Sequence, residues 1–164
     1  MFRRVKLPHD ISGQLYLHSM PGRHEQWADF TAEANRTGIE VIVCLAPDDE
    51  IKEKSPPYAD AIQNGSLSWQ RECFPIPDYS IPGGRKAFAV FLVQVAELLR
   101  YGKTILVHCG AGIGRTGTFA ICLLLVMDVE RMAAEIAVKD AGSYPETDEQ
   151  KRLVDWCEKK FLAT

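Results

Sequence analysis

The sequence has no apolar run long enough to cross a membrane. Its longest, residues 119–127, is far shorter than the ~20 residues that a spanning helix needs, so it indicates a helix buried on all sides. The basic N-terminus lacks an apolar core, so we do not expect a signal peptide. The sequence therefore predicts a cytoplasmic protein that does not bind membranes.

The cysteines show no pairing pattern. Their number is odd, they lie far apart, and no C-x2-C pair occurs among Cys44, Cys73, Cys109, Cys122 and Cys157. This argues against a disulfide scaffold and against a zinc knuckle, and it favours a reducing compartment.

A strong net charge is also missing. The net charge of −3 gives no support for nucleic-acid binding, which usually needs a basic face. A composition of 46% hydrophobic and 25% charged residues is ordinary for a globular protein. We expect one domain over residues 1–164, large enough to bury about 70% of the surface of its unfolded chain. Local charge, not the global field, must then attract any anionic substrate.

Strand patterns alternate with helix patterns along the chain. Strands are expected at residues 13–18, 39–45, 68–74 and 103–107. Helices are expected at residues 25–36, 58–64, 85–100, 115–127, 130–141 and 147–161. This alternation predicts an α/β fold with a central, mainly parallel sheet of four to five strands flanked by helices. Ligands of such sheets bind beyond the carboxyl ends of the strands.

The most informative segment reads HCGAGIGRTG and occupies residues 108–117, directly after the last expected strand. Its glycines allow backbone N–H groups to point inward and form a nest for a phosphate-like anion. The helix that follows adds the positive end of its dipole. The expected anion-binding residues are Gly110, Ala111, Gly112, Ile113, Gly114 and Thr116.

Two side chains in this segment carry chemistry. Arg115 offers a planar fork that can bind two phosphate oxygens at once. Cys109 stands at the rim of the same positive charge, where thiols ionise more easily than usual. Taken singly, a glycine-rich turn can be a tight connection and a cysteine a small buried hydrophobe. The five-residue spacing between them favours a thiolate nucleophile below a phosphate-binding loop.

A phosphate ester also needs a general acid for its leaving oxygen. Asp48, Asp49 and Asp78 all follow expected strands. Asp78 lies among prolines that fix the backbone and before the glycines of residues 83–84, which can act as a hinge. We therefore favour Asp78, although an Asp at this place can simply cap a turn.

This segment resembles the Cys-x5-Arg-Thr/Ser signature loop of protein tyrosine phosphatases, and the Asp78 segment resembles the acid loop of the dual-specificity branch. The resemblance implies a protein tyrosine phosphatase-like fold and a phosphocysteine on Cys109. It also implies that Arg115 binds phosphate, that Asp78 is the acid, that Thr116 donates a hydrogen bond to the Cys109 sulfur, and that His108 orients the loop. No metal or organic cofactor is implied.

The compact length looks most like the kinase-associated branch of these phosphatases. No lysine lies within residues 110–114, where inositol-lipid phosphatases tend to carry basic residues, and the long phosphotyrosine-recognition insert is missing. We therefore expect a shallow pocket and a monomer that acts on phosphotyrosine, phosphoserine or phosphothreonine in proteins or peptides. Some relatives have a water-positioning Gln at the place of Gln150 and a Cys at the place of Cys44 that bonds reversibly to the nucleophile. Gln150 can equally belong to a solvated helix start, and Cys44 can equally be a small buried strand residue.

Three other functions are alternatives to a protein phosphatase. An inositol phosphate or another small phosphoester is the main alternative substrate. A rhodanese-type sulfurtransferase also uses a cysteine loop with a nearby arginine, but it needs no acid such as Asp78. A non-catalytic phosphopeptide-binding module would not need Cys109, Arg115 and Asp78 together.

Overall fold

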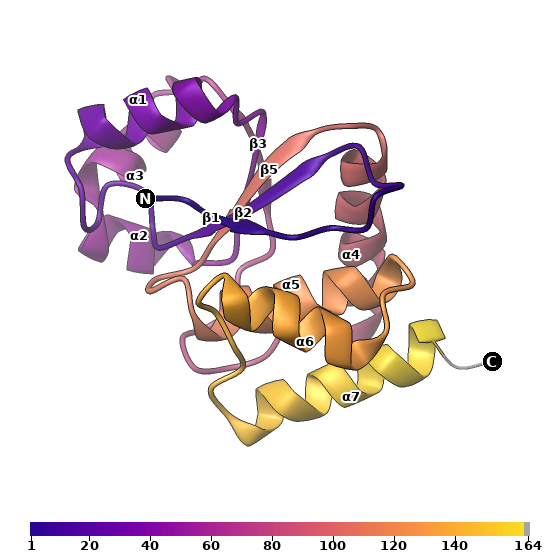
Figure 1. Ribbon diagram of the computed structural model, residues 1–164. Helices are drawn as coiled ribbons and strands as arrows, with labels where there is room; N and C mark the ends of the chain where they lie inside the picture. Colours follow the sequence, from indigo (N-terminus) through magenta and orange to yellow (C-terminus); the bar gives the residue numbers. More distant parts are fainter. Residues whose placement is uncertain (163–164) are drawn as a thin grey trace.

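The computed structural model describes residues 1–162 and contains a single five-stranded sheet with the strand order β1-β2-β5-β3-β4 (Figure 1). The strands are β1 (Arg3–Val5), β2 (Gln14–His18), β3 (Val41–Cys44), β4 (Gln70–Cys73) and β5 (Thr104–His108). All neighbours are parallel except β1, which runs antiparallel to β2. The predicted fold class, an α/β protein with a mainly parallel sheet, is confirmed. The sequence analysis missed β1, because three residues are too few for an alternation pattern.

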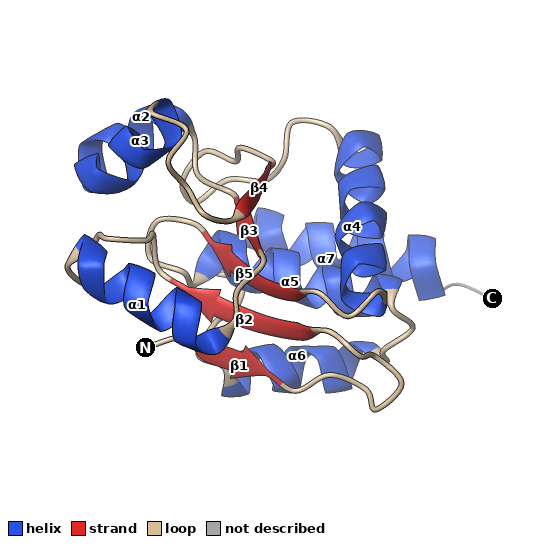
Figure 2. Cartoon of the chain, turned by 90° about the horizontal axis from the view of Figure 1, so that it is seen from above, coloured by secondary structure: helices blue, strands red, loops and turns tan. Residues whose placement is uncertain are grey.

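Seven helices lie on the two faces of the sheet within the described residues. They are α1 (Trp27–Thr37), α2 (Asp48–Lys54), α3 (Pro56–Gln63), α4 (Arg85–Arg100), α5 (Gly114–Val126), α6 (Arg131–Asp140) and α7 (Asp148–Leu162). Helices α1 to α3 lie on one face and α4 to α7 on the other (Figure 2). The sequence analysis did not predict α2, whose seven residues bury only Ile51.

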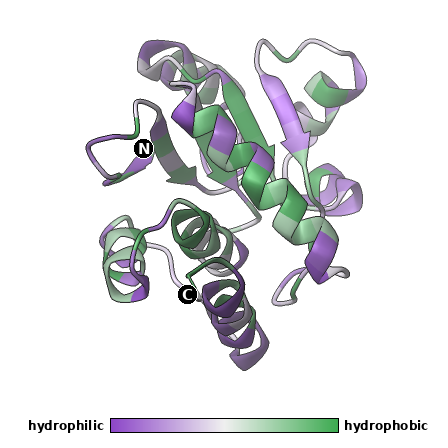
Figure 3. Cartoon of the chain, turned by 90° about the vertical axis from the view of Figure 1, so that its right-hand side faces the viewer, coloured by the Kyte–Doolittle hydropathy of each residue, from purple (hydrophilic) through white to green (hydrophobic). Residues whose placement is uncertain are grey.

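The core has one layer on each side of the sheet. Leu15 and Val107 point toward Phe88 and Phe119 on the α4–α7 side, while Leu106 packs on the α1 side. The hydropathy colouring separates the apolar central strands from the hydrophilic edge strand β4 (Figure 3).

Helix α5 runs through the middle of the α4–α7 layer and is buried from Gly114 to Leu125, as the sequence predicted. None of the described helices is both long and apolar enough to span a bilayer.

The parallel register brings the carboxyl ends of four strands to one edge. His18 of β2 and Cys44 of β3 both lie opposite His108 of β5, and Cys44 also lies opposite Cys73 of β4. The HCGAGIGRTG segment starts at this edge, between the two helical layers, as expected for a ligand site in a parallel sheet.

Gly117 allows α5 to pack closely against the segment after α6. A Cβ atom at this position would lie 2.3 Å from the backbone nitrogen of Tyr144. Helix propensity favours Ala over Gly by about 1 kcal/mol, but the backbone contact cannot be relieved by rotating a side chain. We expect Gly117→Ala to lower the free energy of unfolding by about 1–3 kcal/mol, measured by denaturant titration.

The control is Gly83→Ala, where an added Cβ would meet no atom within 4 Å. It should change the stability by no more than about 0.5 kcal/mol. A Gly117→Ala protein as stable as this control would contradict the packing of α5 described above.

Candidate active site

Cys109 directly follows His108, the last residue of strand β5, and lies at the centre of the site. Residues 109–113 form a loop, and α5 begins at Gly114. The Cys109 side chain is only 2% exposed. The backbone N–H of Gly112 donates to its Sγ at 3.2 Å, so the loop curls around the sulfur.

Gly112 shows why the loop is rich in glycine. Its φ is +77°, and a Cβ atom there would lie 2.4 Å from the carbonyl oxygen of His18. Only glycine satisfies both the left-handed backbone and this close approach. The N–H of Met20 donates to the carbonyl of Gly110 at 3.0 Å, which ties the loop to the turn after β2.

Several loop N–H groups remain available to a ligand. Within residues 1–162, the N–H groups of Gly110, Ala111 and Ile113 donate to no protein acceptor. The first turn of α5 follows immediately and contributes the positive end of its dipole. This group of unpaired backbone donors has the arrangement of the anion-binding nest that the sequence predicts, and the binding itself stays a prediction.

Arg115 is the cation of the site and is 3% exposed. Its Nη1 and Nη2 donate to Glu50 Oε1 and Oε2, both at 2.9 Å, and Nη1 also donates to the carbonyl of Ile76 at 2.8 Å. Burial alone lowers the pKa of the guanidinium, but the hydrogen bonds and charge of Glu50 outweigh this effect and raise it. Arg115 is therefore a permanent, firmly oriented cation.

Asp78 contacts the same guanidinium from the loop after β4. Its Oδ1 accepts from Arg115 Nη2 at 3.0 Å and from the N–H of Tyr79 at 3.0 Å. Its side chain is 47% exposed, so solvent and substrate can reach it, and Lys54 Nζ lies 3.7 Å from Oδ2.

The other two candidate acids lie elsewhere. Asp48 and Asp49 are exposed in the first turn of α2, and neither pairs with Arg115. Of the three candidates, the structure brings only Asp78 to the guanidinium.

Glu50 is a site residue that the sequence analysis missed. It lies one position after Asp49 in α2, and its carboxylate grips both terminal nitrogens of Arg115. Burial raises the pKa of the Glu50 carboxyl, but Arg115 and Lys54 more than offset this effect and lower it. A signal was present, because Glu50 follows the same strand as the acids that were considered. However, the sequence analysis predicted no helix at α2, so it did not indicate that the Glu50 side chain faces the loop.

His108 connects the loop to the opposite helical layer. Its Nδ1 lies 2.9 Å from the carbonyl of Cys109 and its Nε2 lies 2.8 Å from the Tyr58 hydroxyl. Because a carbonyl only accepts, Nδ1 carries the proton and Nε2 accepts from Tyr58. Burial raises the pKa of Tyr58, which keeps this phenol protonated as a donor. This arrangement fits the expected role of His108 in orienting the loop.

Thr116 does not form its expected hydrogen bond, and the Gln150 side chain binds backbone groups of two segments. Thr116 is buried in the first turn of α5, and within the described chain its Oγ1 has no hydrogen-bond partner, so the predicted bond to the Cys109 sulfur is not formed. Gln150 Oε1 accepts from the N–H groups of Glu146 and Thr147 at 2.7 and 3.3 Å. Its Nε2 donates to the carbonyl of Ser80 at 3.3 Å. Gln150 therefore caps the start of α7 and braces the Asp78 loop.

Cys44 lies on the other face of the sheet from Cys109. Its side chain packs with Met20 and Tyr58, whereas Cys109 belongs to the core on the α4–α7 side. The register places Cys44 opposite Cys73 on the neighbouring strand. The described arrangement therefore favours contact between Cys44 and Cys73 over a bond between Cys44 and Cys109.

Comparison with known proteins agrees with this geometry. Residues 11–157 match the family model of the Swiss Army Knife protein DSP-PTPase phosphatase domain. The putative tyrosine phosphatase 197R of Invertebrate iridescent virus 6 is 33% identical over 117 residues, which are 69% of this chain and 41% of that protein. The tyrosine-protein phosphatase non-receptor type 61F of Drosophila melanogaster is 46% identical over 57 residues, 32% of this chain. The chain thus covers only part of these relatives, 10% in the Drosophila case.

Solved structures show the same fold. Kinase-associated phosphatase superposes with a TM-score of 0.82 at 20% identity, covering 100% of this chain and 97% of that one. Tk-PTP in its active form superposes with a TM-score of 0.71 at 25% identity, covering 90% of this chain and 93% of that one. The family match, which spans the whole site from the β2 edge to α7, confirms the resemblance that the signature loop suggested. The chain belongs to the DSP-PTPase family of phosphatase domains, which are phosphomonoester hydrolases.

Proposed function

We propose that this chain is a cysteine-dependent phosphatase that hydrolyses phosphotyrosine, phosphoserine or phosphothreonine in proteins. One observation carries the proposal. Cys109 and Arg115 lie at the two ends of one loop whose N–H groups have no protein acceptor, and Asp78 is hydrogen-bonded to the Arg115 guanidinium. We further propose that residues 1–164 act as one monomeric phosphatase domain. The five free cysteines support the cytoplasm as its compartment.

Arg115 presents one free edge to a substrate. Glu50 occupies the end of the guanidinium and Ile76 takes the second proton of Nη1. The remaining edge consists of Nε, which donates to no described residue, and of Nη2, where Asp78 is bound. A phosphate dianion binds at this edge through two oxygens and replaces Asp78 there. As a nearby like charge, the dianion favours the protonated form of the Asp78 carboxyl.

The first chemical step transfers the phosphoryl group to sulfur. The Cys109 thiolate attacks phosphorus while the bond from phosphorus to the ester oxygen breaks, and Asp78 donates its proton to that oxygen. Arg115 and the N–H groups of the loop stabilise the charge on the equatorial oxygens. The products of this step are a phosphocysteine and a neutral alcohol or phenol.

The second step releases phosphate. Asp78, now a carboxylate, accepts a proton from a water molecule as that water attacks the phosphorus of the phosphocysteine. The sulfur leaves as a thiolate, and the N–H of Gly112 is in place to donate to it. This step leaves Asp78 protonated and Cys109 as a thiolate, so the enzyme is back in the protonation state in which the first step began.

The loop composition supports a phosphoprotein as the substrate. Residues 110–114 contain no lysine or arginine that could bind a second phosphate group. The structural neighbour TpbA of P. aeruginosa, with a TM-score of 0.62 and 16% identity, has been crystallised with phosphotyrosine. A panel of phosphopeptides and inositol phosphates, assayed with and without a chelator, separates this proposal from a phosphatase of small phosphoesters.

The nucleophile is tested by Cys109→Ser. We expect this variant to lose all measurable turnover of a phosphotyrosine peptide and to keep its affinity for inorganic phosphate in calorimetry, because Arg115 and the loop N–H groups remain. Cys73→Ser, which changes an exposed thiol on β4, is the control and should retain wild-type activity. Turnover by Cys109→Ser would overturn the mechanism.

The acid is tested by Asp78→Asn. General-acid help is worth roughly 10²–10⁴-fold, so kcat should fall by about this factor for phenyl or alkyl phosphates. The loss should be much smaller for aryl phosphates whose leaving group needs no proton. Asp49→Asn, on the exposed start of α2, should lower neither rate. If Asp49→Asn or Asp48→Asn shows the leaving-group contrast instead, the acid has been assigned to the wrong residue.

Glu50 is expected to stabilise the fold through Arg115. The Glu50→Gln change removes a charged acceptor from a buried cation, and we expect it to lower the free energy of unfolding by about 1.5–3 kcal/mol at neutral pH. Because the pKa of Glu50 is lowered in the folded protein, its contribution is complete above the usual Glu pKa of about 4.3. The contribution is lost as the pH falls through the lowered folded-state value.

The matched control is Glu53→Gln, an exposed glutamate on the same helix. The measurement is urea unfolding of both variants and the wild type at several pH values. A Glu50→Gln protein that equals the wild type at neutral pH, or whose deficit grows toward acid pH, would contradict the role assigned to Glu50.

A further inference from the structure

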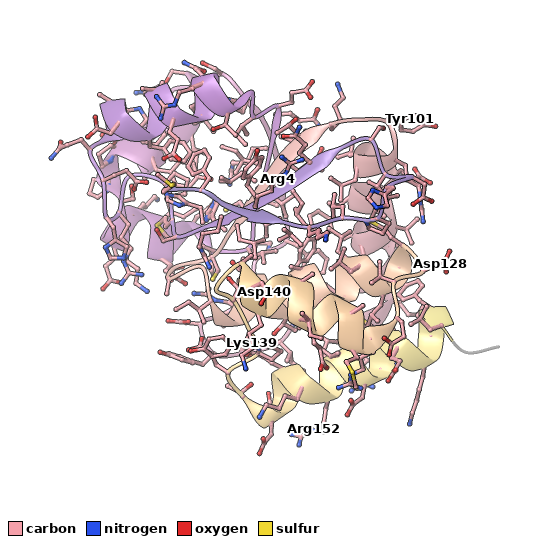
Figure 4. All side chains as sticks on the ribbon, viewed as in Figure 1. Arg4, Tyr101, Asp128, Lys139, Asp140 and Arg152 are labelled. Carbon is pink, nitrogen blue, oxygen red and sulfur yellow. The ribbon has the colours of Figure 1, made fainter. Side chains whose placement is uncertain are left out.

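The side chain of Arg3 reaches the phosphate-binding loop from the N-terminal strand β1. Its Nη2 donates to the carbonyl oxygen of Gly112 at 2.7 Å. Its Nη1 donates to the carbonyl of Ala141 at 2.7 Å and to the hydroxyl of Ser143 at 2.9 Å. Ala141 and Ser143 lie in the segment directly after α6. Figure 4 labels the last two residues of α6, Lys139 and Asp140, and also Arg4, which follows Arg3 on β1. One guanidinium thus joins β1, the segment after α6 and the loop.

Ser143 completes a closed set of hydrogen bonds. It is fully buried, and its hydroxyl donates to the carbonyl of Gly112 at 2.6 Å while accepting from Arg3. The carbonyl of Gly112 therefore receives two donors, one of them charged. Charge-assisted hydrogen bonds of this kind are roughly twice as strong as neutral ones.

These contacts fix the direction of one peptide group. No cis bond occurs among the described residues, so the carbonyl of Gly112 and the N–H of Ile113 point in opposite directions across their shared plane. Because Arg3 and Ser143 hold the carbonyl outside the loop, the N–H of Ile113 is directed into it. That N–H is one of the donors without a protein partner.

The peptide needs such a restraint. Gly112 has a positive φ and no side chain, so it opposes rotation of its peptide plane less than any other residue. A rotated plane would turn a carbonyl oxygen toward a bound anion and remove one N–H donor. Burial lowers the pKa of Arg3, and the charge of the Cys109 sulfur counteracts this effect, which places the guanidinium within electrostatic reach of the nucleophile.

We propose that Arg3, acting through Ser143 and the carbonyl of Gly112, is a positioning residue that holds the N–H of Ile113 toward the substrate phosphate. The inference rests on the proposed phosphatase function and adds a residue outside the signature loop to its machinery. Arg3 touches neither the substrate nor the reacting atoms. It acts by keeping the N–H groups of the loop in the orientation that stabilises the transition state.

The main test compares Arg3→Met with Arg4→Met. Arg4 is the adjacent residue on β1, is exposed and has no ion pair within the described chain, so its change is the matched control. Loss of one oxyanion donor costs about 10²–10³-fold in kcat. We expect Arg3→Met to lower kcat toward that range, with a smaller change in KM, and Arg4→Met to leave both constants unchanged.

Binding of inorganic phosphate provides a readout that does not depend on turnover. In the Cys109→Ser background, we expect the amide resonance of Ile113 to shift strongly when phosphate is added. The added Arg3→Met change should greatly reduce this shift and weaken phosphate affinity. If the wild type hydrolyses no phosphoester at all, the proposed function fails, while this titration still decides whether Arg3 positions the loop.

Two further variants, Ser143→Ala and Arg3→Lys, keep the proposal testable if the Arg3→Met protein does not fold. Ser143→Ala leaves the guanidinium in place, and its effect on kcat should be less than additive with that of Arg3→Met, because both act on one carbonyl. Arg3→Lys should recover part of the activity, since an ammonium can still donate to Gly112 but cannot span all three acceptors. Wild-type kcat and phosphate affinity in a folded Arg3→Met protein, or in Ser143→Ala if Arg3→Met does not fold, would overturn the proposal.

Discussion

The burial of the Arg115 charge is the constraint on which the rest of the site depends. A guanidinium that is 3% exposed must be paired, because an unpaired buried charge costs several kcal/mol. Its partners come from α2 and from the loop after β4, which supplies both the Asp78 carboxylate and the carbonyl of Ile76. Neutralising one cation therefore brings together three segments that are far apart in the sequence: α2, this loop and the start of α5. The same contacts leave a single edge of the guanidinium for a phosphate.

The second constraint concerns backbone direction. In the proposed mechanism the loop binds phosphate with N–H groups, so its function depends on the orientation of peptide planes that carry almost no side chains. Contacts from outside supply that orientation: the N–H of Met20, the imidazole of His108 and the guanidinium of Arg3 each bind a carbonyl of the loop. Each of these bonds turns an acceptor away from the ligand. The net charge of −3 does not attract an anion to the protein as a whole. Attraction of a dianion must therefore come from the loop N–H groups and from the nearby cations Arg115 and Arg3.

The sequence predicted the parts of the fold that long apolar patterns specify. The buried strand β5, the amphipathic helix α4 and the all-round buried helix α5 were found close to their actual bounds. Of the site, Cys109, Arg115 and Asp78 were predicted and do come together, because motif spacing and strand order place them at one sheet edge. The two missed elements are the shortest strand, β1, and the shortest helix, the charged α2, and they contain Arg3 and Glu50. Their roles depend on contacts between distant segments, which periodicity within one segment cannot reveal. The motif also led to one wrong contact, because the hydrogen bond expected from Thr116 to the Cys109 sulfur is not formed. A sequence motif does not determine the direction of a hydroxyl group.

The central claim is that phosphoryl transfer proceeds through the Cys109 sulfur. Its most direct test is to quench turnover in acid with a substrate whose phosphate is radiolabelled, and then to locate the label by peptide mapping and mass spectrometry. The mechanism predicts label on the peptide that contains Cys109, in an acid-stable thiophosphate linkage that hydroxylamine does not release but iodine does. Label on an aspartate or a histidine, or burst-phase phosphate release with no labelled protein at any quench time, would contradict it.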